Sequence, residues 1–208
     1  MLQILAAIIL SYLIGSIPTA YIFGRLLKGI DIRKFGSGNV GTTNAIRLLG
    51  SGWGMVVFII DILKGFLPVV FLGNYLISQN PTVSAVLLRI FLGLACILGH
   101  NWTVFLRFGG GKGVATGLGF LLALSFSVKG FVYVIILSIF IWILVFAFLR
   151  IVSLASIIAS ISLPAWAVIL KQQPEIIILA FVLCLLSLLR HQPNIKRLLK
   201  GQEPSFKK

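Results

Sequence analysis

The sequence predicts an all-α polytopic membrane protein with about seven transmembrane helices. Of its 208 residues, 59% are hydrophobic and only 11% are charged, whereas a soluble domain carries roughly a quarter charged residues. The mean hydropathy is +1.11. Apolar runs of about twenty residues without strand-like alternation favour helices over a barrel, because either must satisfy its own backbone inside the bilayer.

Seven segments have the length and composition of membrane crossings, and we expect residues 1–208 to form a single domain. The fourth segment is short and contains glycine, so we expect it to be tilted, kinked or partly re-entrant. In chain order, the segments lie near residues 2–24, 52–73, 84–105, 114–128, 130–149, 151–170 and 174–189.

The basic residues divide unevenly between the two sides that these segments define. Lys129 and Lys171 fall on one side, while Lys64 and Arg89 lie within spans. The positive-inside rule therefore places the N-terminus outside and the C-terminus in the cytoplasm. The basic residues of the cytoplasmic side are Arg25, Lys28, Arg33, Lys34, Arg47, Arg107, Lys112, Arg150, Arg190, Lys196, Arg197, Lys200, Lys207 and Lys208. This scatter explains the net charge of +14 better than nucleic-acid binding does.

A first polar cluster, residues 36–47, reads GSGNVGTTNAIR and follows the first segment. Its small residues favour a nest of backbone N–H groups around a phosphate, and Arg47 offers a bidentate grip on oxygens. Side-chain donors come from Ser37, Thr42, Thr43 and Asn44. The cluster also fits G-x-G-x-x-G, but a dinucleotide site needs a βαβ unit, which we do not expect here. The alternative, an ordinary turn and helix cap with Arg47 as a topology charge, is equally compatible with the chemistry.

A second polar cluster, residues 99–116, places three adjacent glycines before Lys112 and favours an anion-binding loop at the start of the next helix. It is not a Walker A loop, because Gly113 follows the lysine and Leu106 occupies the first glycine position. The alternative is a flexible hairpin carrying a topology lysine.

A third polar cluster, residues 191–203, follows the last segment. If the chain after Pro193 is helical, Asn194 and Arg197 share a face at i, i+3. We expect Glu203 to pair with a basic residue and fix the tail. The alternative is a basic tail resting on anionic lipid, for which His191 and Asn194 are less expected.

Polar residues also occur inside the predicted spans. Asp61 and Lys64 lie at i, i+3 deep in the second span, where charges are costly, and we expect an internal pair that braces the bundle. Ser153 and Ser156 open the sixth span either as caps or as an extension of the polar site.

Together, the three clusters resemble the signature of the bacterial acyl-phosphate:glycerol-3-phosphate acyltransferases, a family of integral-membrane enzymes. The resemblance extends over essentially the whole chain in span count, cluster order and tail. Two positions depart from the family pattern: Thr103 stands where proline is frequent, and Gly109 where a basic residue is frequent. The matching residues are 36–44 with Arg47, then Gly99, His100 and 110–116, then His191, Asn194, Ile195, 197–199, Gly201 and Glu203.

The resemblance implies a reaction in which the 1-hydroxyl of glycerol 3-phosphate attacks the carbonyl of a fatty acyl phosphate. The products are lysophosphatidate and phosphate, as the first acylation step of bacterial phospholipid synthesis. An acyl phosphate is already activated, so positioning and charge stabilisation suffice without a metal, another cofactor or an obligatory acyl-enzyme. We expect a monomer in the membrane.

The resemblance also assigns roles to residues. The first cluster holds the acyl phosphate, and the glycine loop admits the phosphate of glycerol 3-phosphate. The catalytic residues are Ser37 near the reacting carbonyl, Arg47, His191 as the best candidate for a general base, and Asn194. The alternative is that no base is needed, because a phosphate oxygen of the substrate can take the proton. The substrate-binding residues are Gly38, Asn39, Gly41, Thr42, Thr43, Asn44, His100, Gly110, Gly111, Lys112, Gly113, Ser153 and Arg197. Structural roles fall to Glu203, Asp61 and Lys64.

Two other functions fit parts of the sequence. An organic-phosphate transporter fits the polar loops and the short fourth segment, but transporters often contain paired repeats, and we see none. A non-catalytic scaffold that binds anionic lipid fits the basic face and predicts that charge matters while residue identity does not.

Overall fold

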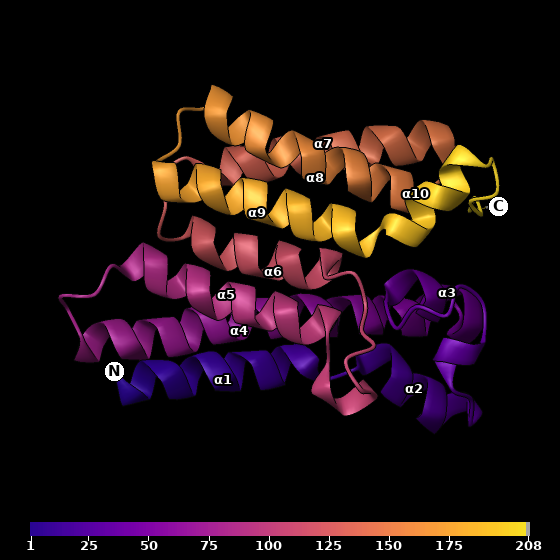
Figure 1. The fold of residues 1–208 in the computed structure, drawn as a ribbon, viewed down its shortest axis with the longest axis horizontal. Coiled ribbons are helices and arrows are strands. Elements are labelled where there is room, and N and C mark those ends of the chain that lie inside the picture. Colours follow the sequence, from indigo (N-terminus) through magenta and orange to yellow (C-terminus); the bar gives the residue numbers. More distant parts are fainter. Residues whose placement is uncertain (207–208) are drawn as a thin grey trace. The chain divides into compact units, whose positions relative to one another are not determined.

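A computed structural model describes residues 1–206, which are helical apart from their connections (Figure 1). Lys207 and Lys208, which the charge pattern assigns to the cytoplasmic side, lie outside the described residues. The chain divides into two compact units, unit 1 over Met1–Ser127 and unit 2 from Val128 onward.

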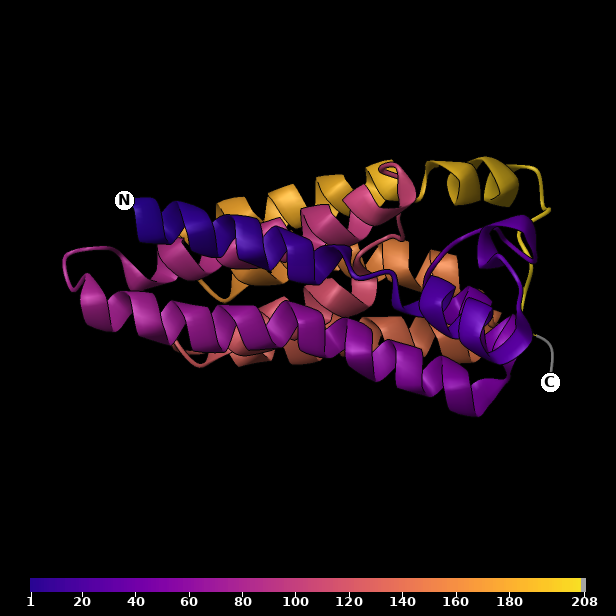
Figure 2. The same cartoon turned by 90° about the horizontal axis from the view of Figure 1, so that it is seen from below.

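Unit 1 is built around the long helix α4, against which α1, α5, α6 and the short helices α2 and α3 pack. Figure 2 shows the indigo α1 and the violet α4 running alongside each other. The elements are α1 (Leu2–Ser16), α2 (Thr19–Lys28), the 3-10 turn η1 (Ile32–Lys34), α3 (Thr42–Leu49), α4 (Ser51–Gln79), α5 (Ala85–Asn101), the 3-10 turn η2 (Val104–Leu106) and α6 (Val114–Ser125).

The first predicted segment, residues 2–24, is not one helix. It breaks between Ser16 and Thr19, and the second piece, α2, continues to Lys28. Pro18 causes the break, because it lacks an N–H and pushes the preceding residue away from helical geometry. Ile17 accordingly has φ −56° and ψ 114°.

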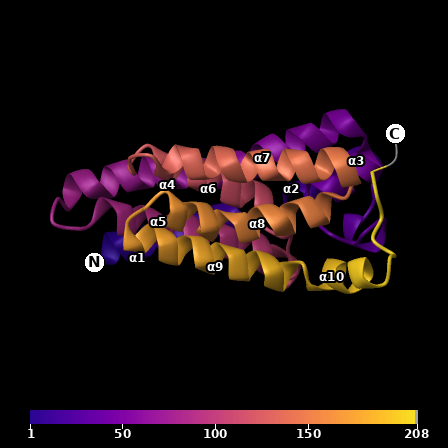
Figure 3. The same ribbon diagram turned by 90° about the horizontal axis from the view of Figure 1, so that it is seen from above.

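Unit 2 contains α7 (Phe131–Leu149), α8 (Val152–Ile169), α9 (Pro174–Arg190) and α10 (Gln192–Leu199). Helix α8 packs against both α7 and α9. Figure 3 shows α10 turning away from the end of α9, and the two helices meet at an angle of 63°. The chain after Pro193 is helical, so Asn194 and Arg197 share a face of α10.

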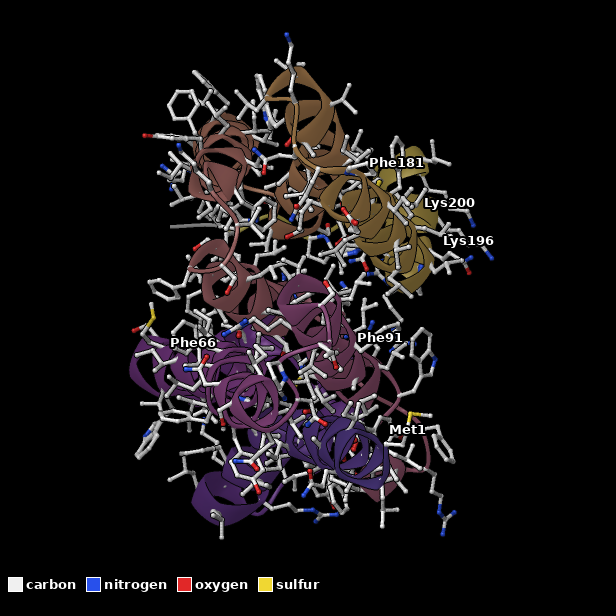
Figure 4. All side chains as sticks on the ribbon, turned by 90° about the vertical axis from the view of Figure 1, so that its left-hand side faces the viewer. Met1, Phe66, Phe91, Phe181, Lys196 and Lys200 are labelled. Atoms are coloured by element: carbon white, nitrogen blue, oxygen red, sulfur yellow. The ribbon has the colours of Figure 1, made fainter. Side chains whose placement is uncertain are left out.

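Length and composition support an integral membrane protein. Five helical segments of the described chain qualify as spans, and α9 with α10 makes a sixth if the bent pair is one span. Helix α6, the expected short fourth segment, has only 12 residues. Large apolar side chains such as Phe91 and Phe181 point outward from their helices (Figure 4), as lipid contact requires. The qualifying segments are Leu2–Lys28, Ser51–Gln79, Ala85–Leu106, Phe131–Leu149 and Val152–Ile169.

Candidate active site

The first cluster is a loop wrapped around the side chain of Asn44, which is 1% exposed in the first turns of α3. Its Nδ2 donates to the carbonyls of Ile32, Phe35 and Asn39 at 3.2, 3.1 and 3.0 Å. Its Oδ1 accepts from the backbone N–H of Ser37 at 3.0 Å. Asn44 thus shapes the loop from within, and its contact with the substrate stays a prediction.

Glycine is required where this loop passes over Asn44. Gly36 has φ +59°, and a Cβ there would lie 2.2 Å from Asn44 Oδ1. Beside this contact, Ser37 is exposed, and Thr42 Oγ1 is buried with no hydrogen-bond partner among residues 1–206. Arg47 is exposed in the last turn of α3. The loop therefore presents Ser37 and Arg47 at its surface while Asn44 holds its shape.

A carboxylate that the sequence analysis did not single out braces the approach to this loop. Asp31 accepts from Arg33 Nε at 3.0 Å and Nη2 at 2.7 Å, and Arg25 lies 3.8 Å away. The hydrogen bonds from Arg33 lower the pKa of Asp31 to about 2. Both guanidinium groups also lie over the ring of Tyr21. The sequence signal was an acidic residue two positions before an arginine in a basic loop.

The second cluster folds back onto the end of α5. The backbone N–H of Gly111 donates to the carbonyl of His100 at 2.9 Å. A Cβ at Gly111 would lie 2.1 Å from His100 Nε2, and one at Gly110 would lie 2.2 Å from His100 O. These glycines are therefore needed for contact with α5, whatever anion the loop binds, and His100 is 6% exposed beneath it. Lys112 is half-buried beside this contact.

Thr103 anchors the start of the same loop. Its hydroxyl donates to the carbonyl of Ser16 at 2.6 Å and accepts from the N–H of Phe105 at 3.2 Å. A proline, frequent at this position in the family that the sequence resembles, has no such hydroxyl. Arg107 and Phe108 then adopt positive φ values of 54° and 62°, which is uncommon for residues other than glycine. Asn101 lies behind the loop, 1% exposed, and its amide atoms have no partner among the described residues.

The structure brings the first two clusters together. Leu106 of the second cluster shares a buried core with Val40, Ala45 and Leu49 of the first. In Figure 1, α3 and the loop between α5 and α6 lie at the same end of unit 1. The first and second clusters, which about fifty residues separate in the sequence, are thus neighbours in the fold.

The third cluster is gathered around Glu203. Its Oε1 accepts from Ser153 Oγ at 2.7 Å and also from Asn194 Nδ2, and its Oε2 accepts from Arg197 Nε at 2.7 Å. Burial alone would raise the pKa of Glu203, but these three hydrogen bonds together lower it. The expected pairing of Glu203 with a basic residue is present. Glu203 also binds three residues that the resemblance places at the substrate, namely Ser153, Asn194 and Arg197.

The ring of His191 is held at the bend between α9 and α10, with 1% exposure. Its Nδ1 lies 2.8 Å from the carbonyl oxygen of Ser187. A carbonyl only accepts, so Nδ1 carries the hydrogen, and Nε2 is the acceptor nitrogen in the neutral ring. This arrangement suits the general base that the sequence analysis expects.

The two serines at the start of α8 have different hydrogen-bond partners in unit 2. Ser153 binds Glu203, whereas Ser156 accepts from Trp142 Nε1 at 3.1 Å. Neither caps α8, which lacks a side-chain cap. Of the two, Ser153 joins the third cluster and Ser156 does not. Convergence of this cluster with the two of unit 1 stays a prediction.

Comparisons with known proteins give a consistent result. The family model described as glycerol-3-phosphate acyltransferase matches residues 5–201. A protein of that name from Aquifex aeolicus is 42% identical over 205 residues, covering 99% of this chain and 100% of its own. Glycerol-3-phosphate acyltransferase 2 of Moorella thermoacetica is 44% identical over 199 residues, covering 96% and 95%.

Two solved structures share the fold. Both are crystal structures of PlsY, an integral membrane glycerol 3-phosphate acyltransferase. The glycerol 3-phosphate form has a TM-score of 0.84 and 41% identity, covering 98% of this chain and 96% of that one. The lysophosphatidic acid form has a TM-score of 0.82 and 40% identity, covering 98% and 95%.

Proposed function

Because this chain belongs to the glycerol-3-phosphate acyltransferase family, we propose that it transfers a fatty acyl group from an acyl phosphate to the 1-hydroxyl of glycerol 3-phosphate. The chain is a membrane-embedded acyltransferase. The observation that carries the choice of donor is the pair of neighbouring glycine-rich loops in unit 1, which share one core. Two phosphate-bearing substrates need two anion sites side by side.

The reaction balances without a metal or other cofactor. The oxygen at position 1 of glycerol 3-phosphate attacks the acyl carbonyl, and the bond from that carbon to the phosphate oxygen breaks. Phosphate leaves with the electron pair, and lysophosphatidate remains. The hydroxyl proton passes to His191 Nε2, which the Nδ1 contact with Ser187 leaves as the acceptor, and then to the departing phosphate, so that the neutral ring is restored.

The binding residues divide by cluster. The surface of the first loop, with Ser37, holds the acyl phosphate near its carbonyl. Arg47 and Lys112 neutralise glycerol 3-phosphate, and Asn194 and Ser153 orient it, as the family resemblance implies. Hydrogen bonds to Glu203 support these last two side chains in one place.

The membrane arrangement that fits this function has seven crossings, with α6 as a short fourth one. The N-terminus is outside, the C-terminus is in the cytoplasm, and the active site faces the cytoplasm of the inner membrane as part of a monomer. The support is the distribution of Lys and Arg, which favours the side of the polar clusters. Cytoplasmic glycerol 3-phosphate then reaches the site without crossing the bilayer.

The test is transfer by the purified protein. With acyl phosphate and glycerol 3-phosphate, we expect equal amounts of phosphate and lysophosphatidate, and no product when acyl-CoA replaces acyl phosphate. Folded protein that releases no phosphate contradicts the proposal. Arg47→Lys should lose activity because an ammonium cannot replace the bidentate fork, whereas a lipid-binding scaffold would tolerate it. Uptake of unchanged glycerol 3-phosphate into proteoliposomes would instead indicate a transporter.

A further inference from the structure

A buried ion pair of α4 lies against the break between α1 and α2. Asp61 Oδ1 and Lys64 Nζ are 2.8 Å apart, and their side chains are 1% and 5% exposed. The break falls inside a stretch, Leu2–Lys28, that qualifies as one membrane span. A helix break leaves backbone groups unpaired, and unpaired backbone groups are costly inside a bilayer. An ion pair at this point can stabilise them.

Each charge of the pair binds one end of the broken helix. Lys64 Nζ donates to the carbonyl of Ile17 at 2.9 Å, at the end of α1. Thr19 Oγ1, at the start of α2, donates to Asp61 Oδ1 at 3.0 Å. Helix C-termini attract cations and N-termini attract anions, so each charge lies at the helix end that favours it. A pair that only stabilised α4 would not need this match.

The same junction touches the second cluster. Ser16, the last residue of α1, accepts through its carbonyl from Thr103 Oγ1, and Tyr12 Oη donates to the carbonyl of Trp102 at 2.7 Å. On the other side of the pair, a Cβ at Gly65 would lie 2.0 Å from the carbonyl oxygen of Thr116 in α6. One turn of α4 therefore contacts the break in α1–α2 and the helix that follows the glycine loop.

From the junction, α2 leads to the first cluster. Ala20 of α2 lies in one core with Ile32 and Ala45, on either side of that loop. Each cluster is held internally by its own contacts, around Asn44 in the first and around His100 in the second. The direction of α2 therefore helps to set the position of one cluster relative to the other, together with the core that the two clusters share.

We propose that Asp61 and Lys64 are positioning residues for acyl transfer, which fix the angle between α1 and α2 and thereby align the two glycine loops. This inference rests on the proposed function for its effect on turnover. Both side chains are buried and bind the helix break, through which they would act. Loosening the junction leaves each cluster folded but displaces one bound phosphate relative to the other, and misplacement by about 1 Å costs on the order of a hundredfold in rate.

The kinetic test uses Thr19→Val, which removes one contact and keeps the ion pair, and Lys64→Met, which removes the cation. Lys129→Met, an exposed lysine of a loop, is the matched control. Turnover is divided by the number of glycerol 3-phosphate sites counted by calorimetry, so that lost folded protein does not count as slow catalysis. We expect turnover per site to fall about ten- to hundredfold in both variants and less than about twofold in the control. Unchanged turnover per site in both variants overturns the inference.

A distance measurement tests the same inference without catalysis. Spin labels are placed on Lys34→Cys, beside the first cluster, and Arg107→Cys, in the second, since both positions are exposed. Cys184→Ala removes the accessible native thiol, while Cys96 is fully buried. Lys64→Met should shift or broaden the distance between the labels, and Lys129→Met should not. An unchanged distance in Lys64→Met refutes the positioning role even if transfer is observed, whereas a changed distance without transfer refutes only the proposed function.

Discussion

Replacing Glu203 by glutamine should weaken the attachment of the C-terminal tail to the third cluster. The glutamine oxygen can still accept from Ser153 and Asn194, so the loss falls on the contact between Oε2 and Arg197. A charged hydrogen bond contributes about 1.5–3 kcal/mol. The Arg197 side chain is 36% exposed, and solvent screening reduces the loss to about 1–2 kcal/mol.

That free energy lowers the ratio of docked to undocked tail by a factor of roughly five to thirty. We expect KM for glycerol 3-phosphate to rise by up to that factor, and the midpoint of thermal unfolding in detergent to fall by a few degrees. Glu175→Gln is the matched control, because this carboxylate is exposed at the start of α9. If both variants have the same KM and melting midpoint, Glu203 does not organise the site.

The contribution of Glu203 also has a defined pH dependence. Its pKa in the folded protein lies below the ordinary value of 4.5, so its stabilisation is present above that value. Stabilisation is lost as the pH falls through the lowered pKa. The stability difference between the native protein and Glu203→Gln should therefore shrink on acidification below pH 4.5, and a difference that grows there contradicts the assignment.

Three further substitutions test the two loops of unit 1. Gly111→Ala places a Cβ 2.1 Å from His100 Nε2 and should abolish acyl transfer. Gly52 has open space around it, so Gly52→Ala should keep the activity of the native protein. Equal activity of the two variants would show that the loop does not need the close contact with His100. Asn44→Ala removes the four hydrogen bonds that the Asn44 side chain makes to the first loop and should cost at least about 2 kcal/mol in chemical unfolding. A variant as stable as the native protein contradicts that role. The pKa of Asp31 is lowered from 3.8 to about 2, so its stabilisation is present above pH 3.8 and is lost as the pH falls through about 2. Asp31→Asn should therefore be less stable than the native protein above pH 3.8 and approach it in stability near pH 2. A stability difference that stays constant across this pH range argues against the ion pair with Arg33.

The helical fold followed from hydropathy, but the break in the first span did not. Pro18 is visible in the sequence, yet apolar residues continue past it, and hydropathy does not register a missing N–H. The Asp61–Lys64 pair was predictable from the cost of isolated charges in a bilayer. Its partners Ile17 and Thr19 were not, because they depend on how α1 and α2 meet α4.

In the candidate site, too, the residue types were predictable from the sequence and their contacts were not. Glycine next to Lys112 indicates close approach, but the sequence does not say to what, and in the structure Gly110 and Gly111 approach His100. Likewise, Asn44 reads as a donor in a phosphate loop, and the fold uses it to close that loop. Polar residue types indicated which loops form the candidate site, whereas the hydrogen-bond partner of each residue was decided by contacts between elements.

All three clusters should face the cytoplasm if they form one active site, and labelling from each side of the membrane can show whether they do. Single cysteines replace Lys34, Arg107 and Lys200, one exposed residue near each cluster, in a Cys184→Ala background; Figure 4 shows Lys200 pointing away from α10. A membrane-impermeant maleimide should label all three in inside-out vesicles and none in right-side-out vesicles. Labelling of any one of them from the outside would contradict a single cytoplasmic site.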